Sequence, residues 1–141
     1  MINEIIDGIS MAINTEFGDG YEIYTEDITQ DLTEPCFSIL CLNPTKEQFL
    51  GRRYFRTNQF CVHYFPSSEN KRFECNQVSE KLSECLEIIT VGGDLVRGTS
   101  LHGEYSEGVL SFFVNYDLFT YKPKEDETQM EAVEFKTDVK G

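Results

Sequence analysis

The stretch YFRTNQFCVHYF, residues 54–65, decides the fold. It contains neither Gly nor Pro, and more than half of its residues are aromatic or β-branched, the types that favour strands. At about 3.3 Å per residue it would reach roughly 40 Å, which is longer than a typical strand. We therefore predict one long central strand here, which bends or projects beyond the body of the domain.

Outward from this strand, other apolar stretches predict the rest of a sheet. PCFSILCLNP (35–44) is apolar on both faces, as in a strand covered on both sides. Residues 95–105 and the alternating VLSFFVNYDLFTYK (109–122) predict a hairpin, and residues 21–25 predict a short strand. Strands joined by short turns pair antiparallel, so the sheet should be mainly antiparallel. PTKEQFLGRR (44–53) predicts a turn or a protruding loop.

Two other stretches repeat apolar residues every three or four positions, as amphipathic helices do. The first stripe covers residues 2–17 and stops at Gly18. The second covers residues 75–89, in a helix that Ser67 or Ser68 should cap. Such helices bury their stripes on a sheet. The predicted fold class is α+β, a mainly antiparallel β-sheet packed with two amphipathic helices in the order α-β-β-β-α-β-β.

The 141 residues fit one domain. We predict a single α+β domain over residues 1–122. The last stretch, residues 123–141, is charged and has few large apolar side chains, so it is predicted to be a flexible C-terminal tail.

The net charge of −13 is unevenly distributed. Residues 1–34 carry nine acids and no base, whereas residues 35–67 carry four bases and one acid. An acidic chain is a poor direct ligand for nucleic acid or for an anionic membrane, because both recognise clustered Lys and Arg. The amino-terminal residues lack the basic start of a signal peptide, so the five cysteines are expected to be reduced thiols in a cytosol.

The two oppositely charged segments predict a contact between copies of the chain. One face of each copy would meet the other face of the next, and such heterologous contacts close into rings when the rotation permits. The alternative is two solvated faces of opposite sign. The candidate interface residues are Arg52, Arg53 and Arg56 on the basic side and Asp27, Asp31 and Glu34 on the acidic side.

Cys61 and His63 are the one arrangement in the sequence that suggests catalysis. They lie two positions apart on one strand face, as a thiolate–imidazole pair requires. No third orienting group is evident, so a packed Cys and a hydrogen-bonded His are favoured over a Cys–His hydrolase. There is no C-x-x-C, no H-x-x-x-H and no phosphate-binding glycine motif, and the spacing of Asp27 and Asp31 matches no calcium loop. We predict no enzyme, no catalytic residue, no metal site and no cofactor.

The sequence resembles a family of tailed-phage and prophage proteins, the tail terminators, over about residues 1–122. The stretches that carry the resemblance are LGRRYFRTNQFCVHYFP, ECNQVSEKLSECLEII and DLVRGTSLHGEYSEGVLSFFVNYDLFTYK, with the opening helix and EPCFSI similar as well. These motifs are structural, and the family has no catalytic residues to carry over.

The resemblance implies a structural assembly protein of the virion tail, made in the host cytoplasm. Such subunits assemble, usually as a hexameric ring, on the last ring of the tail tube and then meet the connector of the head. The implied partners are further copies of the chain, the tail tube protein and the head–tail connector protein. DNA would pass through the ring lumen without specific binding, and acidic residues would suit that channel. A different head–tail connector or completion protein is the alternative within the same setting.

Overall fold

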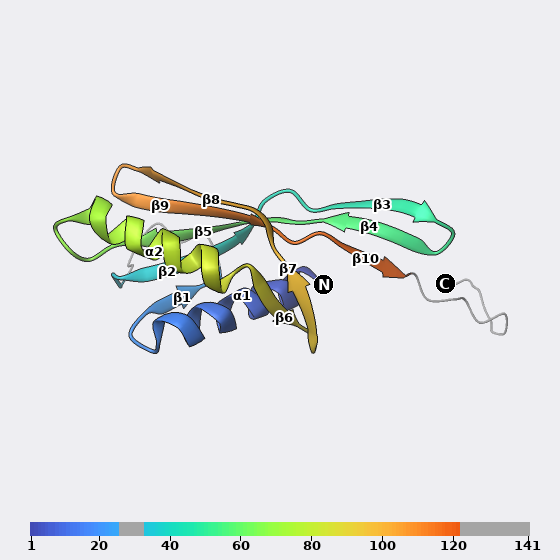
Figure 1. Cartoon of the computed structure of the whole chain (residues 1–141), viewed down its shortest axis with the longest axis horizontal. Helices are drawn as coiled ribbons and strands as arrows, with labels where there is room; N and C mark the ends of the chain where they lie inside the picture. Colours follow the sequence, from blue (N-terminus) through green and yellow to red (C-terminus); the bar gives the residue numbers. More distant parts are fainter. Residues whose placement is uncertain (26–32, 122–141) are drawn as a thin grey trace. The chain divides into compact units, whose positions relative to one another are not determined.

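The structure, a computed structural model, describes residues 1–25 and 33–121, and Figure 1 shows its elements. These residues form two compact units. The first comprises Met1–Thr45 and Thr57–Leu118, and the second comprises Lys46–Arg56 and residues 119–121. The single domain over residues 1–122 stays a prediction, and the charged tail, 123–141, lies outside the described residues.

The first unit contains a five-stranded sheet with the order β1-β2-β5-β9-β8. The strands are β1 (Glu22–Tyr24), β2 (Cys36–Cys41), β5 (Gln59–Phe65), β8 (Thr99–Ser106) and β9 (Val109–Asn115). β5 is central, and its Val62 is paired with Ile39 of β2 and with Phe112 of β9, both in antiparallel register. The edge strand β1 is the exception, since it runs parallel to β2.

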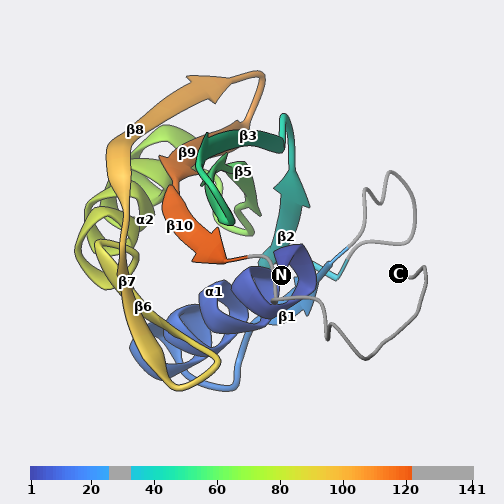
Figure 2. The same ribbon diagram turned by 90° about the vertical axis from the view of Figure 1, so that its right-hand side faces the viewer.

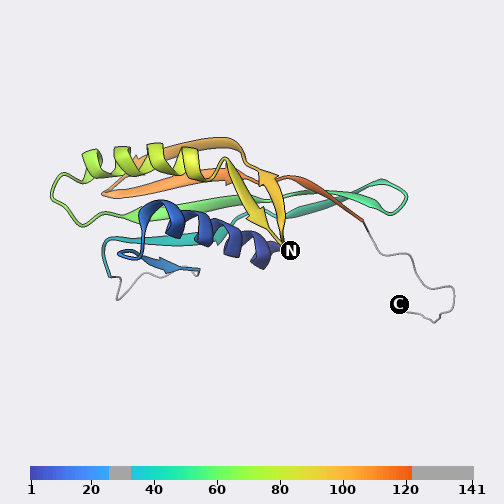
Figure 3. The same cartoon turned by 60° about the horizontal axis from the view of Figure 1, so that its bottom comes forward.

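Two helices, α1 (Ile2–Phe17) and α2 (Lys71–Cys85), pack against one face of this sheet (Figure 2, Figure 3). The predicted stripe of α1 is confirmed, because Ile5, Ile9 and Ile13 are fully buried. Alternate residues of β5 and β9 meet the helices in one hydrophobic core, which includes Phe60, Val62, Tyr64, Leu110, Phe112 and Val114. No helix among the described residues is long and apolar enough to cross a membrane. The predicted α+β class is confirmed.

The start and the end of α2 differ from the prediction. Asn70 caps the helix, with its side-chain oxygen accepting from the Phe73 N–H at 3.4 Å. The Ser67 and Ser68 N–H groups instead donate to the Glu74 carboxylate, at 3.2 and 3.0 Å. These serines stand before the first helical turn, so their side chains do not cap it.

The predicted second stripe, residues 75–89, is divided between two elements. α2 ends at Cys85, and the buried Ile89 belongs to β6 (Ile88–Val91). β6 forms a hairpin with β7 (Asp94–Arg97), and its turn is made by Gly92 and Gly93, both with positive φ.

β6 packs closely against α1 at Gly8. A Cβ added at Gly8 would lie 2.5 Å from the Thr90 carbonyl oxygen. The missing side chain therefore lets the helix and the strand come together.

Each of the three long predicted strands is interrupted once. Residues 54–65 form β4 (Arg53–Thr57) and β5, separated at Asn58, and residues 109–122 form β9 and β10 (Leu118–Tyr121). The Tyr116 N–H donates to the Asn58 carbonyl at 2.9 Å, and Asn58 Nδ2 donates to the Tyr116 carbonyl at 3.1 Å. Residues 95–105 divide at Gly98, where a Cβ would lie 2.8 Å from the Leu86 carbonyl. Close backbone contacts therefore end these strands before their apolar patterns end.

The second unit is a three-stranded sheet with the order β10-β4-β3. β3 (Thr45–Leu50) occupies the stretch predicted as a turn or loop, so that prediction is wrong. β3 and β4 are joined at Gly51–Arg52 into a hairpin, and Gly51 has the positive φ of 54° that such a turn favours. Every residue of β3 is exposed, so the strand lacks the buried face that would have marked it in the sequence.

Candidate assembly interface

The β3–β4 hairpin presents the basic residues of the predicted interface. Arg52 is exposed in the turn, and Arg53 and Arg56 are half-buried on β4. Gln48 Nε2 closes the turn by donating to the Gly51 carbonyl oxygen at 2.8 Å. The structure thus places the three arginines on one hairpin.

The cation of Arg53 lies on aromatic rings. Its guanidinium carbon is 4.3 Å from the ring centre of Phe119 and 5.5 Å from that of Phe49. Phe119 contacts both Phe49 and Phe55, with ring centres 5.4 and 5.0 Å apart. Such cation–π contacts hold a guanidinium in place while leaving its charge uncompensated.

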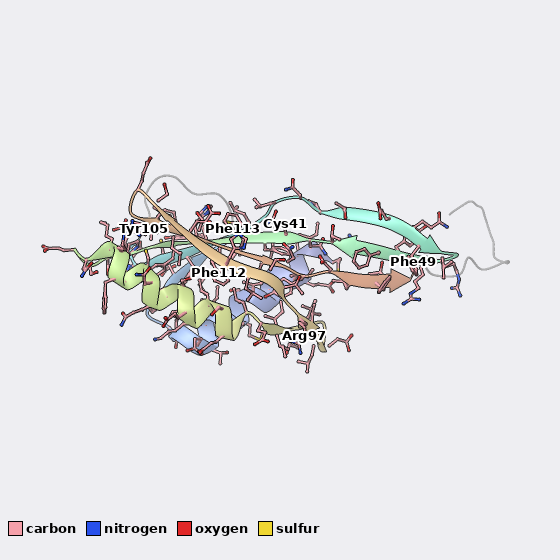
Figure 4. The ribbon with its side chains drawn as sticks, turned by 45° about the horizontal axis from the view of Figure 1, so that its top comes forward. Cys41, Phe49, Arg97, Tyr105, Phe112 and Phe113 are labelled. Atoms are coloured by element: carbon pink, nitrogen blue, oxygen red, sulfur yellow. The ribbon has the colours of Figure 1, made fainter. Side chains whose placement is uncertain are left out.

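Two of these rings are exposed to solvent. Phe49 is 54% exposed and Phe119 is 44% exposed, and with Phe55 they line a hollow of about 340 Å³ in the second unit. Phe49 lies near the turn end of the hairpin (Figure 4). Exposed aromatic rings grouped with arginine are typical of protein interaction surfaces.

Neither Arg53 nor Arg56 forms an ion pair with a residue that the structure describes; the two ion pairs within 1–25 and 33–121 are Met1–Glu4 and Arg97–Glu87. Their Nε atoms are buried and have no hydrogen-bond partner within the same ranges. Arg53 and Arg56 therefore carry positive charge that no ion pair within the described part of the chain neutralises.

The acidic side of the predicted interface is described only in part. Glu34 is exposed just before β2 in the first unit. Asp27 and Asp31 lie outside the described residues. The contact of these acids with the arginines stays a prediction.

Cys61 and His63 do lie together on β5, with Cys61 Sγ 3.6 Å from His63 Nε2. However, Cys61 is only 2% exposed, and burial raises the pKa of its thiol to about 11, although a hydrogen bond with Ser111 acts in the opposite direction. A nucleophilic cysteine needs a lowered pKa, because the thiolate is the reactive form. The pair therefore has the proximity that a hydrolase requires and lacks the activation.

All five cysteines are free thiols. Burial raises the pKa of the other four as well, in Cys85 to about 12. No group of three or more His, Cys, Asp or Glu side chains within the described ranges is placed to hold a metal ion. The thiols are packed side chains.

Sequence reasoning missed the aromatic component of this surface. Phe49 was placed in a loop and Phe119 in a long core strand, so nothing indicated that they would meet. The only available signal was that Phe113 and Phe119 interrupt the polar face of residues 109–122.

Comparison with known proteins identifies one family. A family model described as phage tail terminator protein matches residues 4–128. A solved structure matches this chain with 15% identity and a TM-score of 0.45, and the match covers 84% of this chain and 98% of that structure. No curated protein matches the sequence.

The family match covers most of the chain and agrees with the motifs that carried the resemblance. Members of this family are structural proteins of the virion tail and contact other tail or head components. The chain belongs to the phage tail terminator protein family.

Proposed function

We propose that the protein forms a homo-oligomeric ring, a hexamer as is usual in its family, that ends the tail tube and joins it to the head connector. The family match supports the terminator role. The observation that supports the ring is the positive charge of Arg53 and Arg56 on the β3–β4 hairpin, which no ion pair within the described ranges neutralises, in a chain whose net charge is −13.

The arginines of the hairpin contact acids of residues 1–34 on the neighbouring copy. Arg52, Arg53 and Arg56 supply the basic half, and the candidate acids include Asp27, Asp31 and Glu34. The basic and acidic surfaces are different parts of the chain. Each copy therefore contacts one neighbour through its hairpin and the other neighbour through its acidic residues, and the contacts continue around a ring.

The remaining partners follow from the place of the ring. Its two ends meet the tail tube protein and the head–tail connector protein, and DNA passes through the lumen without specific binding. Carboxylates facing the lumen repel phosphates, which lets DNA slide. Assembly takes place in the host cytoplasm and the mature ring lies in the virion tail.

Native mass spectrometry of the purified protein, alone and with tail tube protein, tests this proposal. We expect a closed oligomer, formed by the protein alone or once the tube end is present. A protein that stays monomeric and does not bind the tail tube protein would contradict the proposal. A head–tail completion protein would instead bind the connector and leave the tube end uncapped, which electron microscopy of isolated tails distinguishes.

A further inference from the structure

The outer side of α1 beside β6 forms an apolar groove in the first unit. Met11 is 66% exposed in the middle of α1, and Ile88 is 45% exposed at the start of β6. A hollow of about 300 Å³ is lined by both, and a second of about 310 Å³ extends from Met11 to the β6–β7 turn. We call this surface the α1–β6 groove.

The groove follows from the packing of Gly8. The helix backbone meets the strand there, since a Cβ at Gly8 would lie 2.5 Å from the Thr90 oxygen. Met11 comes one turn later on α1 and points outward instead of into the core. Figure 3 shows β6 and β7 beside α1, so the groove lies between a helix and a hairpin.

Carboxylates surround this apolar centre. Glu16 lines the first hollow, and Glu4 and Asp7 line the second. All three are exposed, and α1 contains no Lys or Arg. Glu4 is paired with the amino terminus at 3.3 Å, and neither Asp7 nor Glu16 forms an ion pair with any residue of the described ranges.

The turn end of the β3–β4 hairpin has the complementary composition. Phe49 and Leu50 are 54% and 67% exposed, and Arg52 and Arg53 follow them directly. An apolar centre with a cationic border matches an apolar centre with an anionic border. Burial of the two apolar centres away from water stabilises the contact, and the opposite charges around them fix the orientation of one copy on the other.

We propose that the turn end of the hairpin of one copy docks in the α1–β6 groove of the next copy. The inference rests on the proposed ring and names the contact that closes it. It places Met11, Asp7 and Glu16 at the contact. The acidic side of the contact is thus a small part of the acidic segment, residues 1–34, and not the whole of it. Docking removes Leu50 and Met11 from water together.

Complementation between two variants tests the docking. Leu50→Asp disables the hairpin and Met11→Lys disables the groove, and both side chains are exposed, so the fold is retained. Each variant alone should self-associate at least about tenfold more weakly than the natural chain. An equimolar mixture should form mixed pairs and no larger oligomer. In each pair the intact hairpin of the Met11→Lys copy occupies the intact groove of the Leu50→Asp copy, and the hairpin and groove left over are both disabled. Native mass spectrometry with one variant isotope-labelled identifies these mixed pairs.

Exposed apolar residues outside both surfaces provide matched controls. Leu95→Asp on β7 and Phe73→Lys on α2 replace side chains that are 76% and 57% exposed, and they should assemble as the natural chain does. A photoreactive benzoylphenylalanine introduced at Phe49 should cross-link to residues 7–16 or 85–93 of a differently labelled copy.

The outcomes separate the docking from the proposed function. Unchanged rings in both variants, or cross-links that map elsewhere, overturn the docking and leave the ring intact. Mixtures that remain monomeric while the natural chain forms rings also overturn it. A natural chain that stays monomeric both alone and on tail tubes overturns the ring and the docking together.

Discussion

At the scale of single residues, Cys61 shows how burial decides chemistry. Its sulfur lies 3.6 Å from His63 Nε2, the proximity that the sequence suggested. Desolvation by burial is the largest effect on this thiol and raises its pKa to about 11, although a hydrogen bond with Ser111 acts in the opposite direction. At neutral pH the thiol is therefore protonated and acts as a small apolar side chain.

Alkylation of the native protein tests this state of Cys61. We expect Cys61 to react no faster than the other four cysteines. Its rate should still rise about tenfold per pH unit up to roughly pH 10, because the thiolate fraction grows until the pH reaches the pKa. Mass spectrometry of the labelled peptides gives the rates, and the half-buried Cys41 is the internal control. Rapid labelling of Cys61 that levels off near pH 7 would instead favour the hydrolase alternative.

At the scale of elements, the sequence predicts those helices and strands whose buried residues recur at regular intervals. The steps of three and four in residues 2–17 place Ile5, Ile9 and Ile13 in the core, and alternation in β9 does the same for Leu110, Phe112 and Val114. Both patterns record burial directly, so both helices and the five-stranded sheet were predictable.

The breaks within elements were not predictable, because they depend on contacts between distant segments. Asn58 ends one strand through hydrogen bonds to Tyr116, and Gly98 ends another through its approach to Leu86. β3 was missed because it has no buried face, and the aromatic surface depends on β10 lying beside β4. The basic half of the candidate interface was visible as a charge cluster, whereas its aromatic half required the sheet order.

Gly8 provides a test of element packing. Gly8→Ala should lower the free energy of unfolding by about 1–3 kcal/mol, because the new Cβ would press on the Thr90 carbonyl. Helix propensity alone predicts a gain of about 1 kcal/mol, so the two effects have opposite signs. The matched control is Gly20→Ala, where no atom lies within 4 Å of the added Cβ and a change within about 0.5 kcal/mol is expected. Urea denaturation followed by circular dichroism measures both, and a stabilised Gly8→Ala would mean that α1 and β6 are not in close contact.

At the scale of the whole molecule, charge is the dominant feature. The hairpin residues 46–56 carry four cations and one carboxylate, whereas the rest of the chain is strongly acidic. Copies therefore repel each other at long range and attract where a hairpin meets an acidic surface. Salt screens exposed charges beyond about 8–10 Å, so assembly should depend on ionic strength.

Reversing hairpin charge tests this attraction. Arg52→Glu combined with Arg53→Glu should lower assembly and flatten its dependence on salt, as measured by sedimentation over a salt series. Lys71→Glu with Arg72→Glu makes the same charge change on α2, where acids suit the start of the helix, and should leave assembly unchanged. Equal loss in both double variants would mean that net charge, and not the hairpin, governs assembly.

The hydrogen-bonded pair of Asn58 and Tyr116 has an evolutionary consequence. Two of the strand connections into the second unit leave from this pair, and beyond it the register of β5 with β9 begins at Gln59 and Asn115. Insertions or deletions within residues 46–56 would leave that register untouched. Selection can therefore change the length of the hairpin without disturbing the five-stranded sheet, and related proteins should differ in length there while their sheets stay alike.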